Sequence, residues 1–170
     1  MRILLKLVLD IDADAAWRAL HSQAALAELY GPLLRVEALA APVPTVADGD
    51  DVPVRYSTLG VGVGSHLISV HDRRKTDTNG DVRILRDSGI PLTGPLASLD
   101  VWDHQMAVCP LPGDPSRTLW RERLVIGGGW APALWAPLWA MWQWRGARLK
   151  SLAPTWAFDP QPLHADAVGA

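Results

Sequence analysis

Residues 124–145 read LVIGGGWAPALWAPLWAMWQWR, an uncharged stretch of 21 residues followed by Arg145. Five of the nine tryptophans of this 170-residue chain lie between Trp130 and Trp144. So many large, stiff aromatic side chains in one segment must fill a core, line a cavity or lie in a membrane. The interpretation of this stretch therefore decides both the fold and the function expected of the chain.

The second half of the stretch has the pattern of an amphipathic helix. At about 100° per residue its apolar side chains share one broad arc, with two tryptophans at the edge of the arc: Leu134, Leu138, Met141, Trp142, Leu149 and Leu152, then Trp135 and Trp139. Arg145 projects from the middle of this arc. Pro132 suits a first helical turn, and Pro137 predicts either a kink or the true start of the helix. The pattern therefore predicts a helix with a buried or half-buried cation.

A membrane span is the alternative for the same stretch, because about 20 apolar residues cross a bilayer. The glycines at 127–129 break the helical pattern, and without them and the residues before them only about fifteen residues remain, which is too few. The tryptophans also run through the whole segment instead of marking its two ends. We therefore expect no membrane span, and a helix lying at a membrane interface remains an open alternative.

Length and composition predict a single domain, which we assign to residues 1–158, followed by a disordered tail at 159–170. The chain is 49% hydrophobic and 20% charged, as is typical of a globular protein. A net charge of −2 gives no basic surface for nucleic acid. The start of the chain lacks a signal-peptide pattern, so we expect a cytoplasmic protein. The excess of arginine over lysine, with abundant alanine, suggests a bacterial source.

The order of predicted elements gives the fold class. Residues 2–11 alternate in polarity as a half-buried strand does, and Asp12 and Ser22 are candidate N-caps for two short helices over 13–21 and 23–30. Six further strands are predicted, with a hairpin turn at Asn79-Gly80: 33–39, 52–59, 67–72, 81–87, 99–108 and 117–126. We therefore predict an α+β fold in which a curved antiparallel sheet of about six or seven strands wraps around the long C-terminal helix.

Four short motifs accompany this order of elements. They are DADAAW at 12–17, a Gly-Pro pair at 94–95 followed by Trp102-Asp103-His104, TLWRE at 118–122, and WQWR at 142–145. Over roughly residues 1–155 the chain resembles the START-like (SRPBCC) superfamily, of polyketide cyclase/dehydrase and lipid-transport type. That resemblance implies a helix-grip fold with an internal cavity for a hydrophobic molecule, such as a lipid or a polyketide.

Pairing of the strands at 99–108 and 117–126 would create a polar cluster beneath the helix. A turn centred near residue 113 places His104 opposite Glu122, Met106 opposite Trp120, and Trp102 opposite Leu124, all on one apolar face. Arg145 of the helix would then meet His104 and Glu122. One interpretation is an acid/base pair with Arg145 stabilising an enolate or a carboxylate. The other is a buried Glu122–Arg145 ion pair completed by His104.

We therefore predict that the chain binds a hydrophobic or aromatic small molecule between sheet and helix. The predicted ligand-binding residues are Tyr56, Trp102, Met106, Trp120, Leu124, Trp135, Leu138, Trp139, Met141 and Trp142. A cavity smaller than roughly 300 Å³ would argue against this prediction. Two alternatives remain open: a cyclase- or dehydratase-type enzyme that uses His104, Glu122 and Arg145, and a peripheral lipid-shuttling protein that contacts a membrane through Trp144.

No metal or nucleotide cofactor is expected in any of these cases. Cys109 is the only cysteine, and His66 and His71 would lie on opposite faces of one strand. The glycines at 60, 62 and 64 lack the spacing of a dinucleotide-binding loop. The expected partner is a hydrophobic small molecule and not nucleic acid, membrane contact is not favoured, and the sequence predicts no oligomeric state.

Overall fold

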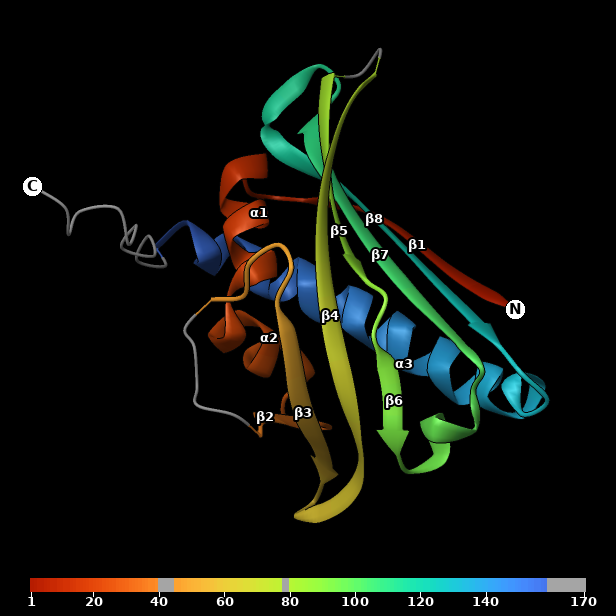
Figure 1. Cartoon of the computed structure of the whole chain (residues 1–170). Helices are drawn as coiled ribbons and strands as arrows, with labels where there is room; N and C mark the ends of the chain where they lie inside the picture. The colour runs from red at the N-terminus through yellow and green to blue at the C-terminus, as the bar shows by residue number, and fades with distance from the viewer. Residues whose placement is uncertain (40–44, 78–79, 159–170) are drawn as a thin grey trace, which may run out of the picture.

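The computed structural model describes residues 1–39, 45–77 and 80–158, and these form an α+β fold (Figure 1). Its sheet is antiparallel, with the strand order β1-β8-β7-β5-β4-β3-β2, and β6 pairs with β4. The strands are β1 (Arg2–Leu9), β2 (Arg35–Ala38), β3 (Asp51–Thr58), β4 (Val61–Asp77), β5 (Gly80–Asp87), β6 (Ile90–Thr93), β7 (Val101–Leu111) and β8 (Asp114–Gly127). The helices are α1 (Ala13–His21), α2 (Gln23–Tyr30) and α3 (Ala131–Leu152), with 3-10 turns η1 (Pro95–Ser98) and η2 (Ala153–Phe158). The predicted tail at 159–170 and Asn79 lie outside the described residues.

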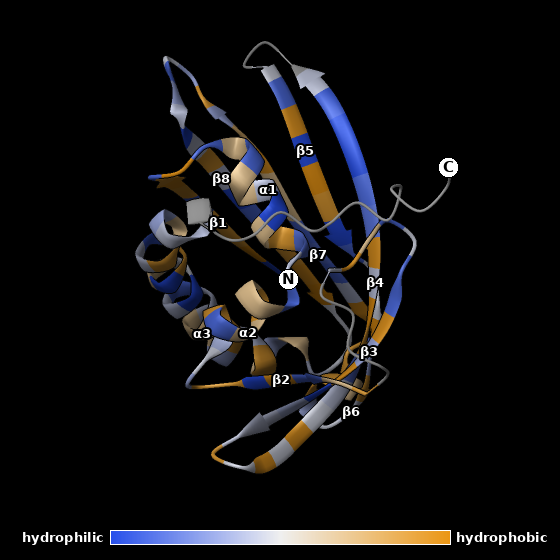
Figure 2. Cartoon of the chain, turned by 90° about the vertical axis from the view of Figure 1, so that its left-hand side faces the viewer, coloured by the Kyte–Doolittle hydropathy of each residue, from blue (hydrophilic) through white to orange (hydrophobic). Residues whose placement is uncertain are grey.

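The two short helices begin at the predicted caps. An Asp12 carboxylate oxygen accepts hydrogen bonds from the backbone N–H groups of Asp14 and Ala15, both at 2.9 Å. The Ser22 hydroxyl accepts one from the N–H of Ala25 at 3.2 Å. These bonds satisfy N–H groups that have no partner inside a helix. Helices α1, α2 and α3 all lie on the concave side of the sheet (Figure 2).

Helix α3 lies across that concave side, between β1 and α2 (Figure 1). It begins at Ala131, so Pro137 lies inside the helix and does not mark its start. Gly146 allows the close approach to β1, because a β-carbon there would lie 3.0 Å from a methyl carbon of Leu5. In the part of the chain that the structure describes, no helix is long and apolar enough to cross a membrane.

The strand predictions need two corrections at the β4 region. Strand β4 runs from Val61 to Asp77, well beyond the predicted 67–72, and its first residues include Gly62 and Gly64. Strand β6 was missed, because it has only four residues and contains Pro91, a residue that sequence patterns associate with strand ends. β6 pairs with β4 near residues 65–67 and so shapes the end of the sheet that carries the candidate site.

The predicted β7–β8 register is wrong by two residues. His104 pairs with Leu124, Met106 with Glu122, and Trp102 with Ile126. The ladder changes register between Pro110 and Leu111, which places extra β8 residues before Thr118 that a simple turn centred near 113 does not include. Because the error is an even number of residues, every side chain stays on the predicted face. The side chains of His104 and Glu122 are therefore still neighbours, along a diagonal of the sheet.

Candidate functional site

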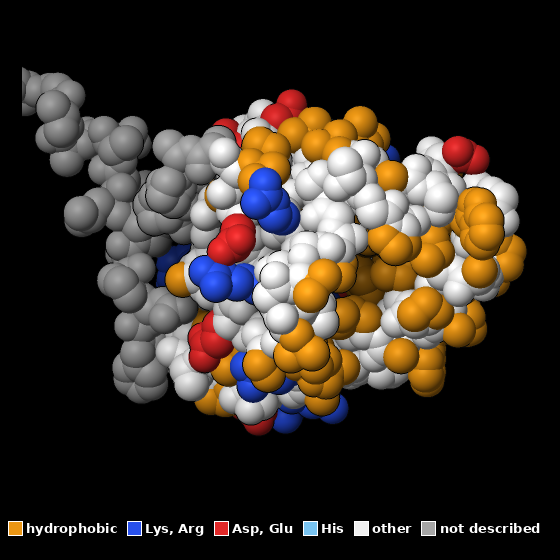
Figure 3. Space-filling view, turned by 90° about the horizontal axis from the view of Figure 1, so that it is seen from below, with side chains coloured by type: hydrophobic (Ala, Val, Ile, Leu, Met, Phe, Trp, Pro, Cys, Tyr) orange, Lys and Arg blue, Asp and Glu red, His pale blue; other side chains and the backbone are white. Residues whose placement is uncertain are grey.

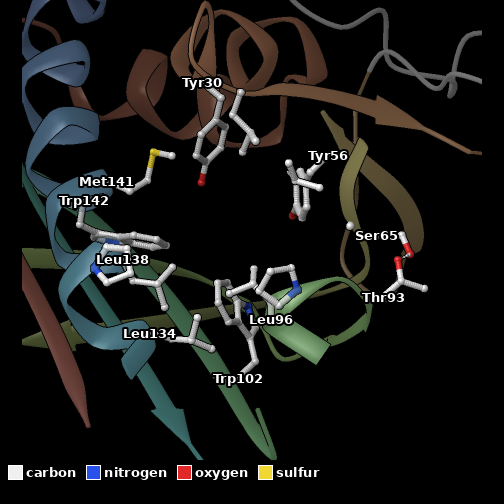
Figure 4. Close-up of a pocket in the computed structure, with 15 residues that line it drawn as sticks. Tyr30, Tyr56, Ser65, Thr93, Leu96, Trp102, Leu134, Leu138, Met141 and Trp142 are labelled. Atoms are coloured by element: carbon white, nitrogen blue, oxygen red, sulfur yellow. Dashed lines mark hydrogen bonds between the residues drawn. The ribbon is translucent and has the colours of Figure 1, made fainter. Parts of the chain in front are cut away.

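A cavity of about 260 Å³ lies between α3 and the end of the sheet formed by β3, β4 and β6 (Figure 4). Its wall is mainly apolar and comes from six parts of the chain: Tyr30, Leu34, Tyr56, Val63, Gly64, Ser65, Thr93, Pro95, Leu96, Trp102, Leu134, Pro137, Leu138, Met141 and Trp142. The hydroxyls of Ser65 and Thr93 are 2.8 Å apart and satisfy each other. Seen from below, this face of the molecule is hollowed among hydrophobic side chains (Figure 3).

Five of the ten predicted ligand-binding residues line this cavity: Tyr56, Trp102, Leu138, Met141 and Trp142. The other five do not, and three of those lie deeper in the protein. The sulfur of Met106 is 3.4 Å from Nη2 of Arg145, and Leu124 is fully buried in the main core. Trp120 packs beside Trp156, with 6.3 Å between ring centres. These three residues belong to the packed interior and not to the cavity wall.

Of the remaining two, Trp135 lies beside the start of β1 and Trp139 is 46% exposed. Their rings stack 6.4 Å apart, and the indole N–H of Trp135 donates to the backbone carbonyl of Arg2 at 3.2 Å. Both belong to the edge of the predicted apolar arc, and the structure shows that this edge faces away from the cavity. Trp144, the predicted membrane contact, is half-buried and has the guanidinium of Arg148 6.0 Å from its ring.

Sequence reasoning missed ten lining residues. Most belong to three short segments, the end of α2, the start of β4 and the β6–η1 turn, which approach α3 only in the folded chain. Two signals were present in the sequence: Leu134 lies on the apolar arc of α3, and the Gly-Pro pair at 94–95 belongs to one of the four motifs. Gly94 has a φ of 81° and lies against the Val63 carbonyl, so no larger residue fits this turn.

Behind the cavity, the structure brings His104, Glu122 and Arg145 together. Nε of Arg145 donates to both carboxylate oxygens of Glu122, at 3.0 and 3.1 Å. Nε2 of His104 lies 3.2 Å from one of these oxygens, and the indole N–H of Trp120 donates to the other at 2.9 Å. All four side chains are buried. The carboxylate is therefore fully hydrogen-bonded away from water, as a buried charge requires.

The charges of this cluster stabilise each other. Burial alone would raise the pKa of Glu122, but Arg145 and then His104 outweigh burial and lower that pKa to about 2. Burial alone would lower the pKa of Arg145, but Glu122 outweighs it and the pKa is raised. At neutral pH the pair is therefore a carboxylate and a guanidinium.

None of the three cluster residues lines the cavity, and two side chains stand between. The ring of Trp142 packs edge-on against His104, with 5.1 Å between ring centres. The guanidinium carbon of Arg145 lies 5.1 Å from the centre of the Tyr30 ring. The cluster can therefore orient these two rings and act on the cavity through them. Its catalytic role remains a prediction.

A second buried polar cluster, centred on Asp87, supports Trp102 in the cavity wall. One carboxylate oxygen accepts the backbone N–H groups of Ser69 and Gly89, at 3.1 and 3.0 Å. The other accepts the indole N–H of Trp102 at 3.2 Å and lies 3.4 Å from Nε2 of His66. Burial alone would raise the pKa of Asp87, but His66 and the Gly89 N–H outweigh it and the pKa is lowered. Sequence reasoning missed this cluster, which fixes the Trp102 ring at the cavity wall.

The structure separates the two histidines of β4, as predicted. His66 is buried against Asp87, whereas His71 is exposed on the other face. Among the described residues, no group of three or more histidine, cysteine or carboxylate side chains is arranged to hold a metal ion.

Comparison with known proteins identifies the fold. No family model and no curated protein matches the sequence. Solved structures do share the fold. A protein from Arthrobacter aurescens has a TM-score of 0.64 and 12% identity, over 99% of this chain and 93% of that one. The Zhui aromatase/cyclase from a Streptomyces species has a TM-score of 0.54 and 15% identity, over 91% of this chain and 93% of that one. Norcoclaurine synthase from Thalictrum flavum, in complex with dopamine and hydroxybenzaldehyde, has a TM-score of 0.57 and 11% identity, over 91% of this chain and 87% of that one.

The chain thus has the helix-grip fold of START-like (SRPBCC) proteins, as its sequence motifs predicted. Identities this low establish the fold and leave function to be argued from the site itself.

Proposed function

We propose that this protein binds a small, flat, hydrophobic molecule in the cavity between α3 and the sheet. The observation that carries the proposal is the composition of the wall. Two tryptophan rings, Trp102 and Trp142, meet at 6.3 Å between ring centres, and leucine, proline and methionine side chains complete the surface. An apolar pocket with few polar groups is the usual form of a small-molecule site.

The size of the cavity restricts the ligand. At about 260 Å³ the cavity is smaller than the roughly 300 Å³ that the sequence-based prediction requires, which counts against binding of a drug-sized ligand, a long lipid or an extended polyketide chain. A dry cavity of about 150 Å³ is known to bind benzene. The space here therefore suits a bicyclic aromatic molecule or a monocyclic one with a short substituent. This is narrower than the lipid- or polyketide-like ligand predicted from the sequence.

The structural neighbours are consistent with an aromatic ligand. The norcoclaurine synthase structure contains dopamine and hydroxybenzaldehyde, both single-ring aromatics, and the Streptomyces neighbour is an aromatase/cyclase. These proteins share only the fold with this chain, so their ligands support the class of molecule and not a reaction.

The buried cluster of His104, Glu122 and Arg145 supports binding more than catalysis. The Glu122 carboxylate is bonded to Arg145 and His104, and the rings of Trp142 and Tyr30 stand between the cluster and the cavity. We infer that the cluster holds those two rings in place. The lipid-shuttling alternative gains no support from Trp144, which packs with Arg148.

Isothermal titration with 2-acetylnaphthalene tests the proposal. We expect saturable binding at one site in the wild type, and at least a tenfold loss of affinity in Leu138→Trp, whose indole would occupy the cavity. Ala140→Trp is the matched control, because it adds the same side chain to the exposed side of the same helix and should bind normally. Absence of binding to the wild type, or equal binding by Leu138→Trp, would contradict the proposal, provided that both variants melt cooperatively.

A further inference from the structure

We propose that the inner end of the cavity holds a carbonyl oxygen of the ligand between the hydroxyls of Tyr30 and Tyr56, which makes the cavity selective for aromatic ketones and aldehydes. This inference rests on the proposed binding function and names the chemical class that the site would take. The polar groups that face an otherwise apolar space carry it.

The two tyrosines enter the cavity from α2 and β3, and the Tyr30 ring also packs against Arg145 of α3. Tyr30 is the last residue of α2 and Tyr56 lies in β3, and in Figure 4 the oxygen ends of both rings point into the cavity. The other two hydroxyls of the wall, those of Ser65 and Thr93, are hydrogen-bonded to each other. The indole N–H of Trp102 is bonded to Asp87, so the groups of the described wall left to recognise a polar atom of the ligand are the two tyrosine hydroxyls and the buried, unpartnered indole N–H of Trp142.

These hydroxyls are donors. Burial raises the pKa of Tyr56, and burial also raises the pKa of Tyr30 although Arg145 opposes the rise. Each phenol therefore keeps its proton at neutral pH and has an O–H to donate. Removing such a donor from water without giving it a partner is unfavourable. When a ligand fills the cavity and displaces water from it, a ligand oxygen beside these hydroxyls avoids that cost.

Arg145 determines the sign of charge that this end of the cavity prefers. Its guanidinium faces Tyr30 at both the ring and the hydroxyl oxygen. A hydroxyl that faces a cation through its oxygen has its proton available for a partner on another side, such as a ligand atom in the cavity. Two O–H donors backed by a cation favour an atom with partial negative charge, such as a carbonyl oxygen, over a donor such as an amine.

A matched pair of probes tests the inference: 2-acetylnaphthalene and 2-isopropenylnaphthalene, which have the same shape but carry C=O and C=CH₂ respectively. Each lost hydrogen bond should cost about 0.5–1.5 kcal/mol. In Tyr56→Phe we expect the Kd of the ketone to rise about threefold to tenfold, and in Tyr30→Phe/Tyr56→Phe to rise further. The Kd of the alkene should change less than about twofold in either variant, which controls for damage to the cavity.

The outcomes separate this inference from the function on which it rests. If neither probe binds the wild type, the proposed function fails. If both bind and the tyrosine variants change the two Kd values by the same factor, the cavity binds ligands but the carbonyl subsite does not exist. A loss of affinity in the tyrosine variants for the ketone alone supports both the binding function and the carbonyl subsite.

Discussion

Arg145 of α3 and Glu122 of β8 form a two-point contact, in which one guanidinium nitrogen lies 3.0 and 3.1 Å from the two carboxylate oxygens. Both side chains are almost completely removed from solvent, at 2% and 0% exposure. The pair joins the long helix to the sheet behind the cavity, and each charge depends on the other to remain buried.

Removing one member of this pair should therefore destabilise the protein strongly. We expect Arg145→Met or Glu122→Gln to lower the free energy of unfolding by about 3–5 kcal/mol, since each leaves a buried polar group without its partner. The double variant should lose at least about 2 kcal/mol less than the sum of the single losses. Urea denaturation measures all three.

The exposed ion pair of Arg117 and Asp114 provides the control for that series. Arg117→Met should leave the urea midpoint unchanged, because exposed pairs contribute little. Additive losses in the Glu122 and Arg145 variants would show that the two residues act independently, contrary to the geometry.

The pH dependence of stability should show the same pair. The pKa of Glu122 is lowered from its ordinary value of 4.5 to about 2 in the folded protein, so its contribution is complete above pH 4.5 and disappears as the pH falls towards 2. The expected loss over this range is roughly 3 kcal/mol. In Glu122→Gln the loss between pH 5 and pH 2 should be smaller, although Asp87, whose pKa is also lowered, continues to contribute. Equal slopes for wild type and variant would rule out an ionised Glu122.

Gly94 should tolerate substitution much less well than Gly60. Both glycines have a φ of 81°, so alanine is strained at either position. At Gly60 the new β-carbon meets no atom within 4 Å, whereas at Gly94 it overlaps the Val63 carbonyl. We expect Gly94→Ala to cost a further 1–3 kcal/mol or so by thermal unfolding and to weaken ligand binding. Similar melting temperatures for the two variants would contradict this packing.

The sequence predicted the elements better than their exact placement. Alternation at residues 2–11, the caps Asp12 and Ser22, and the apolar arc of α3 are local patterns, and the structure confirms them. The β7–β8 register depends on a bulge near Pro110 that no local pattern marks. The triad of His104, Glu122 and Arg145 nevertheless came together, because a two-residue error preserves the face of each strand.

The cavity wall was harder to predict, because half of its residues come from segments with no periodic signal. Tyr30 ends a short helix, and Thr93 ends a four-residue strand that contains a proline. Conversely, Trp135 lies against β1 and Trp139 is largely exposed, since helical geometry gives the width of an apolar arc but not which part of it faces the cavity. Deciding which of these side chains line the cavity requires the tertiary packing of the chain.

The indole N–H signals of the tryptophans in a nitrogen-15 NMR spectrum test the central claim most directly, with assignment by single Trp→Phe variants. Upon addition of 2-acetylnaphthalene, the signals of Trp102 and Trp142, which line the cavity, should shift in a saturable manner. Those of Trp130 and Trp139, which are 66% and 46% exposed, should not move. Shifts at Trp130 or Trp139 with unchanged Trp102 and Trp142 would place the ligand on the surface of α3 and contradict the account.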